Sequence, residues 1–217
     1  MSSAHVSVPG HAHHFETREQ QFEAAKQGMW IFLVTEVLMF GGLFVAYVVF
    51  RGWYVDMFHE AHRYLSVAAG ATNTVVLITS SLTMMLAVSA TQRGDRKRAQ
   101  MFLWFTLILA FAFFGVKYWE YSHKIHDGLL PGALFTNTEL KDPKAPLFFS
   151  LYFVMTGLHG LHVAIGIGLI AWIMRRNARN EFNPVYYTPV EIVGFYWHFV
   201  DLVWIYVFPL FYLIGLT

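Results

Sequence analysis

The sequence has no cysteine among its 217 residues. Disulfide frameworks, thiolate zinc sites, cysteine-ligated iron-sulfur clusters and cysteine nucleophiles are therefore excluded. Charged residues are scarce, at 13% of the chain, and they stand in short blocks rather than in the basic stripe that binds nucleic acid. Nucleophile elbows, phosphate-binding loops and dinucleotide-binding fingerprints are also missing. We therefore expect this chain alone to catalyse no reaction.

Apolar residues are abundant instead. With 56% hydrophobic and 18% aromatic residues, the chain is too apolar for a soluble domain of this length. Five segments exceed the roughly 20 residues that a helix needs to cross the hydrocarbon core. Their apolar runs are continuous, which favours helices over the alternating strands of a barrel. We predict an all-α integral membrane protein, a bundle of five transmembrane helices at residues 28–50, 64–91, 99–121, 146–174 and 188–215.

The residues before the first span are polar. Residues 1–26 lack the apolar core of a signal peptide, so we expect a retained cytoplasmic tail followed by a single membrane domain at residues 27–217. Imidazole titrates near neutral pH, so the histidines of this tail are a possible proton-collecting antenna. A solvated tail without such a role is the alternative. The histidines are His5, His11, His13 and His14.

Basic residues predict the orientation in the membrane. Two of the predicted loops, after the second and the fourth span, carry seven of the fifteen Lys and Arg residues. Cytoplasmic loops are enriched in Lys and Arg, so these loops and the N-terminus are predicted to be cytoplasmic and the C-terminus periplasmic. The loop residues are Arg93, Arg96, Lys97, Arg98, Arg175, Arg176 and Arg179.

Glu36 lies near the middle of the first span. An ionised carboxylate there costs roughly 2.5 to 3.5 kcal/mol on insertion scales, so the side chain should be protonated, paired or turned toward another helix. Two interpretations follow from this position. Glu36 is either a packing acid bonded to a neighbouring helix, or part of a proton relay or lipid cleft.

Two histidines share a face of the fourth span. His159 and His162 are three residues apart, which suits metal ligation, but a metal site also wants a carboxylate and a second ligand pair. We therefore favour interhelical hydrogen bonds and predict no metal on this chain. The same span has small residues at a spacing of four, where another backbone is expected to approach closely. They are Thr156, Gly160, Ala164 and Gly168.

The fifth span has a polar stripe at spacings of three, four and three, which is one helical face over about 15 Å. The favoured interpretation is a polar seam that holds a bundle or subunit interface, and the alternative is a proton path. His198 and Asp201 can pair with each other or bond separate helices. Lys117 and Glu120 are predicted to form a simple pair near the outer end of the third span. The stripe comprises Glu191, Gly194, His198 and Asp201.

A series of short motifs occurs in order from about Lys26 onward. The most specific are Thr156-Gly157-Leu158-His159-Gly160-Leu161-His162-Val163 and Tyr196-Trp197-His198-Phe199-Val200-Asp201-Leu202-Val203-Trp204. The others are Gly28-Met29, Thr35-Glu36-Val37-Leu38-Met39-Phe40, Asn73-Thr74, Gly94-Asp95-Arg96-Lys97 and Trp119-Glu120-Tyr121. In this order they resemble subunit III of the haem-copper terminal oxidases, most closely the cytochrome c oxidase type.

The resemblance implies a non-catalytic subunit of a respiratory, proton-pumping oxidoreductase in the bacterial inner membrane. Haems and copper would lie in partner subunits, with subunit I as the main contact and subunit II receiving electrons. No cofactor is implied on this chain beyond bound phospholipids. The family is thought to support sustained turnover and proton supply to subunit I. The positions that match family polar residues are Glu36, Asn73, Glu120, His159, His162, His198 and Asp201.

The resemblance has one departure and leaves alternatives open. The full-length family form has seven spans, and this chain lacks the first two, so a partner is expected to supply them. Glu36 favours the cytochrome c class over the quinol oxidase class, but the electron donor stays open. A small proton channel or secondary transporter is the rival of a different class, and the absence of repeated halves counts against it. Too few clustered histidines are present for a membrane oxygenase.

Overall fold

The computed structural model describes residues 15, 17–140 and 142–213. Within these residues helices are the main regular secondary structure, beside two isolated β-bridges, and five helices are long and apolar enough to cross a membrane. The predicted helical class and the five spans are thus confirmed, whereas the four tail histidines lie outside the described residues. The elements are α1 (Arg18–Trp53), α2 (Val55–His62), α3 (Val67–Gln92), α4 (Arg96–His126), η1 (Gly132–Leu134), α5 (Ala145–Ala178), α6 (Thr188–Phe208) and η2 (Pro209–Leu213).

Helix α1 begins at Arg18, well before the predicted start of the first span at residue 28. The Thr17 side chain caps it by accepting a hydrogen bond from the Gln20 amide at 3.1 Å. A helix of 36 residues is about 54 Å long, whereas the hydrocarbon core is about 30 Å thick. The polar residues at its start therefore project beyond the hydrocarbon as a continuation of the same helix.

The short helix α2 was not predicted. It follows α1 directly, so α3 begins at Val67 rather than at residue 64. Its buried side chains include Met57 and Phe58, and the ring of Phe58 packs edge-on against Phe148 of α5 at 5.2 Å between centroids. Helix α2 therefore closes one end of the bundle.

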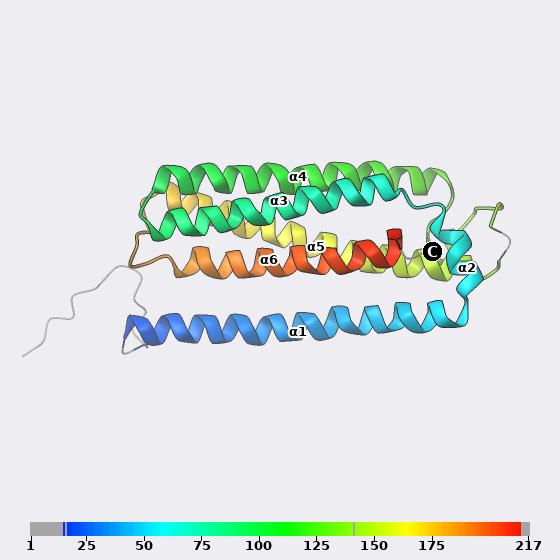
Figure 1. Ribbon diagram of the computed structural model, residues 1–217, viewed down its shortest axis with the longest axis horizontal. Helices are drawn as coiled ribbons and strands as arrows, with labels where there is room; N and C mark the ends of the chain where they lie inside the picture. The colour runs from blue at the N-terminus through cyan, green and yellow to red at the C-terminus, as the bar shows by residue number, and fades with distance from the viewer. Residues whose placement is uncertain (1–14, 16, 141, 214–217) are drawn as a thin grey trace, which may run out of the picture.

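The five long helices are packed unequally (Figure 1). Helices α3 and α4 lie side by side, α6 lies between them and α1, and α1 runs along the edge of the bundle. In the most apolar stretch of each helix, 56% of residues are buried in α6 but 11% in α1. Helix α6 is therefore the centre of the bundle, and most of the surface of α1 faces outward.

Close helix packing occurs at glycines outside the predicted stripe. A Cβ on Gly166 of α5 would lie 2.6 Å from the Trp197 ring of α6, so this contact requires glycine. Gly168 has no heavy atom within 4 Å of such a Cβ, and Gly160 has one atom of Phe114 at 3.8 Å. The expectation of a close backbone approach along the small-residue stripe was therefore wrong within this chain.

The two basic loops lie at the same end of the bundle. The guanidinium of Arg96, at the start of α4, donates to the carbonyls of Asn177 (2.7 Å) and Ala178 at the end of α5. Carbonyls in the last turn of a helix lack partners within it, so Arg96 caps α5. This contact joins the loop after α3 to the loop after α5.

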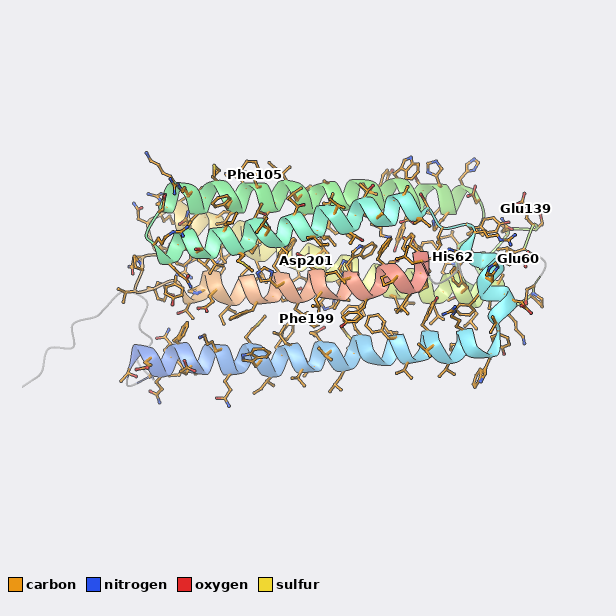
Figure 2. All side chains as sticks on the ribbon, in the orientation of Figure 1. Glu60, His62, Phe105, Glu139, Phe199 and Asp201 are labelled. Carbon is orange, nitrogen blue, oxygen red and sulfur yellow. The ribbon has the colours of Figure 1, made fainter. Side chains whose placement is uncertain are left out.

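The π-helical turn η2 is anchored at the opposite end. The Tyr47 hydroxyl of α1 donates to the Leu210 carbonyl, and Nδ1 of His62 in α2 lies 2.7 Å from the Phe211 carbonyl. Because a carbonyl accepts, Nδ1 carries the hydrogen. Figure 2 shows His62 beside the end of this turn. Side chains from α1 and α2 thus supply hydrogen bonds that the turn lacks.

Candidate functional site

Glu36 of α1 and His162 of α5 form a hydrogen-bonded pair. Oε2 of Glu36 lies 2.9 Å from Nε2 of His162, and the two side chains are 14% and 11% exposed. Nδ1 of His162 is 2.8 Å from the Leu158 carbonyl and therefore donates to it. Nε2 and the carboxyl group then hold one proton between them, either as imidazolium and carboxylate or as imidazole and carboxylic acid. The pair avoids an isolated charge among the spans.

His159 has a different environment, although it lies one turn from His162. Its ring is fully buried between Phe113 of α4 and Trp204 of α6, with centroids 5.4 and 5.1 Å away. Neither ring nitrogen has a hydrogen-bond partner among the described residues. The predicted interhelical hydrogen bond is therefore made by His162 and not by His159.

A buried ionic group connects α4, α5 and η2, and we call it the lysine cluster: Lys117, Glu120, Lys124, Tyr152 and Tyr212. Glu120 accepts from Lys117 at 2.8 Å, from Lys124 at 3.4 Å and from the Tyr212 hydroxyl at 2.7 Å. The ammonium of Lys117 also donates to Tyr212 at 2.9 Å and to Tyr152 at 3.3 Å. These side chains satisfy one another away from water, as buried charges require.

The predicted pair of Lys117 and Glu120 is thus part of a larger group. Lys124 stands four residues after Glu120, so the helical period could have revealed it. Tyr152 and Tyr212 are far away in sequence, and no local pattern marks them. The side chains of Lys117 and Glu120 are 8% and 2% exposed, which places the group in the bundle interior.

The polar stripe of α6 faces α3, and we call this contact the α3–α6 seam. Ser81 and Nδ1 of His198 are 2.5 Å apart, and the Trp197 indole donates to Ser80 at 2.9 Å. A third bond runs from the Trp204 indole to Thr74 at 3.1 Å. His198 therefore bonds a separate helix rather than Asp201.

The other stripe residues are less well paired. Asp201 is 3% exposed, and Figure 2 shows it on the side of α6 that faces α3, with Phe199 on the side toward α1. Ser81 interacts with Asp201, but neither carboxyl oxygen has a hydrogen-bond geometry with a described residue. The same holds for the fully buried amide of Asn73 on α3. Glu191 lies in the first turn of α6, where the helix dipole favours an acid.

Metal-ligating side chains do not converge in the part of the chain that the structure describes. No group of three or more His, Asp or Glu residues there could hold an ion. A cavity of about 480 Å³ lies instead between α1, α5 and α6, near the start of α1. Its walls are mainly apolar and include Met29, Phe32, Leu169, Trp172 and Tyr196. This lining fits an apolar ligand rather than a cation.

Comparison with known proteins decides the family. The model of the family "Cytochrome c oxidase subunit III" matches residues 10–216. This chain belongs to the cytochrome c oxidase subunit III family. The resemblance that the motifs predicted is thereby confirmed, as are the membrane location and the role as a subunit of a terminal oxidase.

Three relatives show which classes of oxidase subunit this chain resembles. Cytochrome c oxidase subunit 3 of Thermostichus vulcanus is 35% identical over 188 residues, covering 86% of each chain. The same subunit of Bacillus sp. strain PS3 is 30% identical over 190 residues, covering 88% of this chain and 86% of the relative. Quinol oxidase subunit 3 of Bacillus subtilis is 33% identical over 194 residues, covering 87% and 86%. Both oxidase classes are therefore represented at similar identity.

Proposed function

We propose that this chain is the non-catalytic subunit III of a proton-pumping cytochrome c oxidase in a bacterial inner membrane. The observation that carries the proposal is the family match over residues 10–216 of a chain with five spanning helices. Relatives named as cytochrome c oxidase subunits support this class. A quinol oxidase is the alternative, since a subunit of that class is 33% identical.

In this role the polar side chains stabilise the bundle. The Glu36–His162 pair joins α1 to α5, and the lysine cluster joins α4 to α5 and η2. The α3–α6 seam joins α3 to α6. Subunit I, with its haems and copper, would be the main partner, and subunit II would receive electrons. A well-held bundle supports turnover by keeping the catalytic neighbour in one arrangement and by assisting proton supply to it.

The surfaces of the bundle fit the remaining parts of the proposal. The basic loops joined by Arg96 would be cytoplasmic, which places the start of α1 on that side and η2 on the periplasmic side. Residues 1–26 would be the cytoplasmic tail with its proton-collecting histidines, and residues 27–217 the membrane domain, although α1 already begins at Arg18. Phospholipid would fill the cavity between α1, α5 and α6.

Copurification tests this function. A tagged form of the chain, extracted in a mild detergent, should bring with it a membrane subunit that contains haem and copper. The complex should oxidise reduced cytochrome c, and complexes depleted of this chain should lose activity during continued turnover. Recovery of the chain without a haem-containing partner, or with stoichiometric haem of its own, contradicts the proposal. Oxidation of a quinol but not of cytochrome c assigns the other class.

The proton shared by Glu36 and His162 favours one rival function, a small proton channel. Liposomes that contain this chain alone would then show proton flux, and Glu36→Gln would abolish it. For the subunit proposal we expect no flux above that of empty liposomes.

A further inference from the structure

A second groove lies on the outer surface of the bundle, between α4 and α5. Its volume is about 660 Å³, and its lining includes Phe113, Phe114, Lys117, Gly160 and Ala164. Tyr118 and Leu161, which also line it, are 79% and 55% exposed. The groove is therefore open to the surroundings of the bundle, and we call it the α4–α5 groove.

The lining of the α4–α5 groove changes from apolar to polar along its length. Phe113 and Phe114 lie at one end of the α4 wall, whereas Tyr121 and Ser122 lie two turns further on, about 12 Å away, with Ile125 one turn beyond them at the rim. The Tyr121 hydroxyl bonds Thr156 of α5 at the polar end. Lys117 stands between the two ends. This is the order in which a membrane amphiphile presents its chain and its headgroup.

The depth of Lys117 in the membrane fits this order. Arg96 begins α4 at the basic end of the bundle, and Lys117 follows 21 residues later, since 117 − 96 = 21. At 1.5 Å per residue the separation is about 30 Å, the thickness of a hydrocarbon core. Lys117 thus lies at the level of the opposite lipid headgroups, and the apolar end of the groove lies deeper.

The charge beside the groove is positive. The lysine cluster buries two ammonium groups, Lys117 and Lys124, against the single carboxylate of Glu120. Asp127 also interacts with Lys124, but from the exposed end of α4, where its side chain is 52% exposed. An anion beside Lys117 would offset the remaining buried charge, which an apolar helix from a neighbouring protein would not do.

We propose that the α4–α5 groove binds an anionic phospholipid, with one acyl chain along Phe113, Gly160 and Ala164 and the headgroup at Lys117. The proposal rests on the lipid-binding part of the proposed function and adds a site separate from the cavity between α1, α5 and α6. The three N–H groups of Lys117 already donate to Glu120, Tyr152 and Tyr212, so the net positive charge of the lysine cluster attracts the headgroup phosphate without a direct hydrogen bond, and the apolar walls cover the acyl chain.

Photo-crosslinking of the intact complex in lipid nanodiscs tests the site. The probes are phosphatidylglycerol and phosphatidylcholine, each with the same diazirine-bearing acyl chain, and labelled peptides are mapped by mass spectrometry. Phosphatidylglycerol should label residues 113–114 and 160–164 about fivefold more than phosphatidylcholine does, the selectivity that one lysine near a headgroup provides. Equal labelling by the two lipids overturns the proposal. Crosslinks from a neighbouring protein that occupies the groove overturn it as well.

Two variants test the acyl-chain site and the headgroup site separately. Gly160→Leu should fill the groove and abolish labelling there, whereas Gly168→Leu, on the same helix but outside the groove, should leave it unchanged. Lys117→Met should remove the preference for phosphatidylglycerol. Unchanged labelling in Gly160→Leu rejects the site. Haem content and turnover of the same samples report on the proposed function separately, and the purified full chain can be labelled if no partner copurifies.

Discussion

Oε2 of Glu36 lies 2.9 Å from Nε2 of His162, and this hydrogen bond joins the outermost helix to the rest of the bundle. Helix α1 also contacts α6 through aromatic rings, such as Phe32 with Tyr196 and Phe44 with Tyr206, and its Tyr47 hydroxyl donates to the Leu210 carbonyl of η2. Aromatic rings tolerate small rotations of a helix, whereas a hydrogen bond between two buried polar atoms has a narrow geometry. The pair, together with the Tyr47 hydrogen bond to η2, therefore fixes the rotation of α1 about its own axis.

A double-mutant cycle on this pair should show energetic coupling. Glu36→Leu or His162→Leu alone leaves a polar partner without its hydrogen bond, whereas the double variant removes both groups. We expect a coupling energy of about 1 kcal/mol, in the range measured for hydrogen bonds between membrane helices. Retention of the chain in the complex during a denaturant titration measures it. Additive effects of the two substitutions would show that the side chains act independently.

Glu120→Gln should be strongly destabilising. It removes the carboxylate that faces two buried ammonium groups, and breaking a buried pair in this way costs about 3 to 5 kcal/mol. Asp95→Asn is the matched control, because its partner Arg98 is 69% exposed and a surface pair contributes less than about 1 kcal/mol. The thermal denaturation midpoint of the purified complex compares the two. Equal midpoints would mean that the lysine cluster is not a stabilising element.

Gly166→Ala should loosen the contact between α5 and α6. The added Cβ would lie 2.6 Å from the Trp197 ring, and such overpacking costs about 1 to 3 kcal/mol. Gly168→Ala meets no atom within 4 Å and gains helix propensity, so its stability should be unchanged or slightly higher. Intrinsic fluorescence of the tryptophans during thermal unfolding distinguishes the variants. The opposite order of stabilities contradicts the close packing described here.

The absence of cysteine gives a direct test of orientation. Arg93→Cys, between α3 and α4, and Thr138→Cys, between η1 and α5, place single thiols at exposed positions, and these two connections lie at opposite ends of the bundle (Figure 1). If the basic loops are cytoplasmic, a membrane-impermeant maleimide should label Thr138→Cys in intact spheroplasts and Arg93→Cys after the membrane is opened. Labelling of Arg93→Cys in intact spheroplasts would reverse the proposed orientation.

The spans could be predicted from sequence because the environment imposes them. Every backbone group in lipid must be bonded within its own segment, so a long apolar run has few alternatives to a helix. Helix α3, which is rich in Ser and Thr, follows the same rule. The hydroxyls of Thr72, Thr74 and Thr79 donate to the carbonyls four residues earlier. Helix α2 escaped prediction because it has eight residues, too few for a periodic signal.

The partners of the polar residues could not be predicted, because the period of one helix says nothing about which helix lies beside it. Glu36 was expected to find a polar neighbour, but its pairing with His162 depends on where α1 meets α5. A small residue likewise predicts space beside a helix, but it does not predict which side chain or ligand occupies that space. Gly160 lines an open groove and Gly166 a tight contact, although both are glycines of the same helix.

The anchoring of η2 has a consequence for how the chain is made. Its carbonyls accept hydrogen bonds from Tyr47 and His62, and its Tyr212 donates to Glu120. Residues 209–213 are the end of the fifth span, so the ribosome has synthesised the other four spanning helices and all of α6 before these bonds can form. Until then, Tyr47 of α1 and His62 of α2 lack their hydrogen bonds to η2. When a C-terminal linker fills the ribosomal tunnel, a nascent chain that ends before residue 209 should expose the α1–α2 junction to protease, and one that includes η2 should protect it.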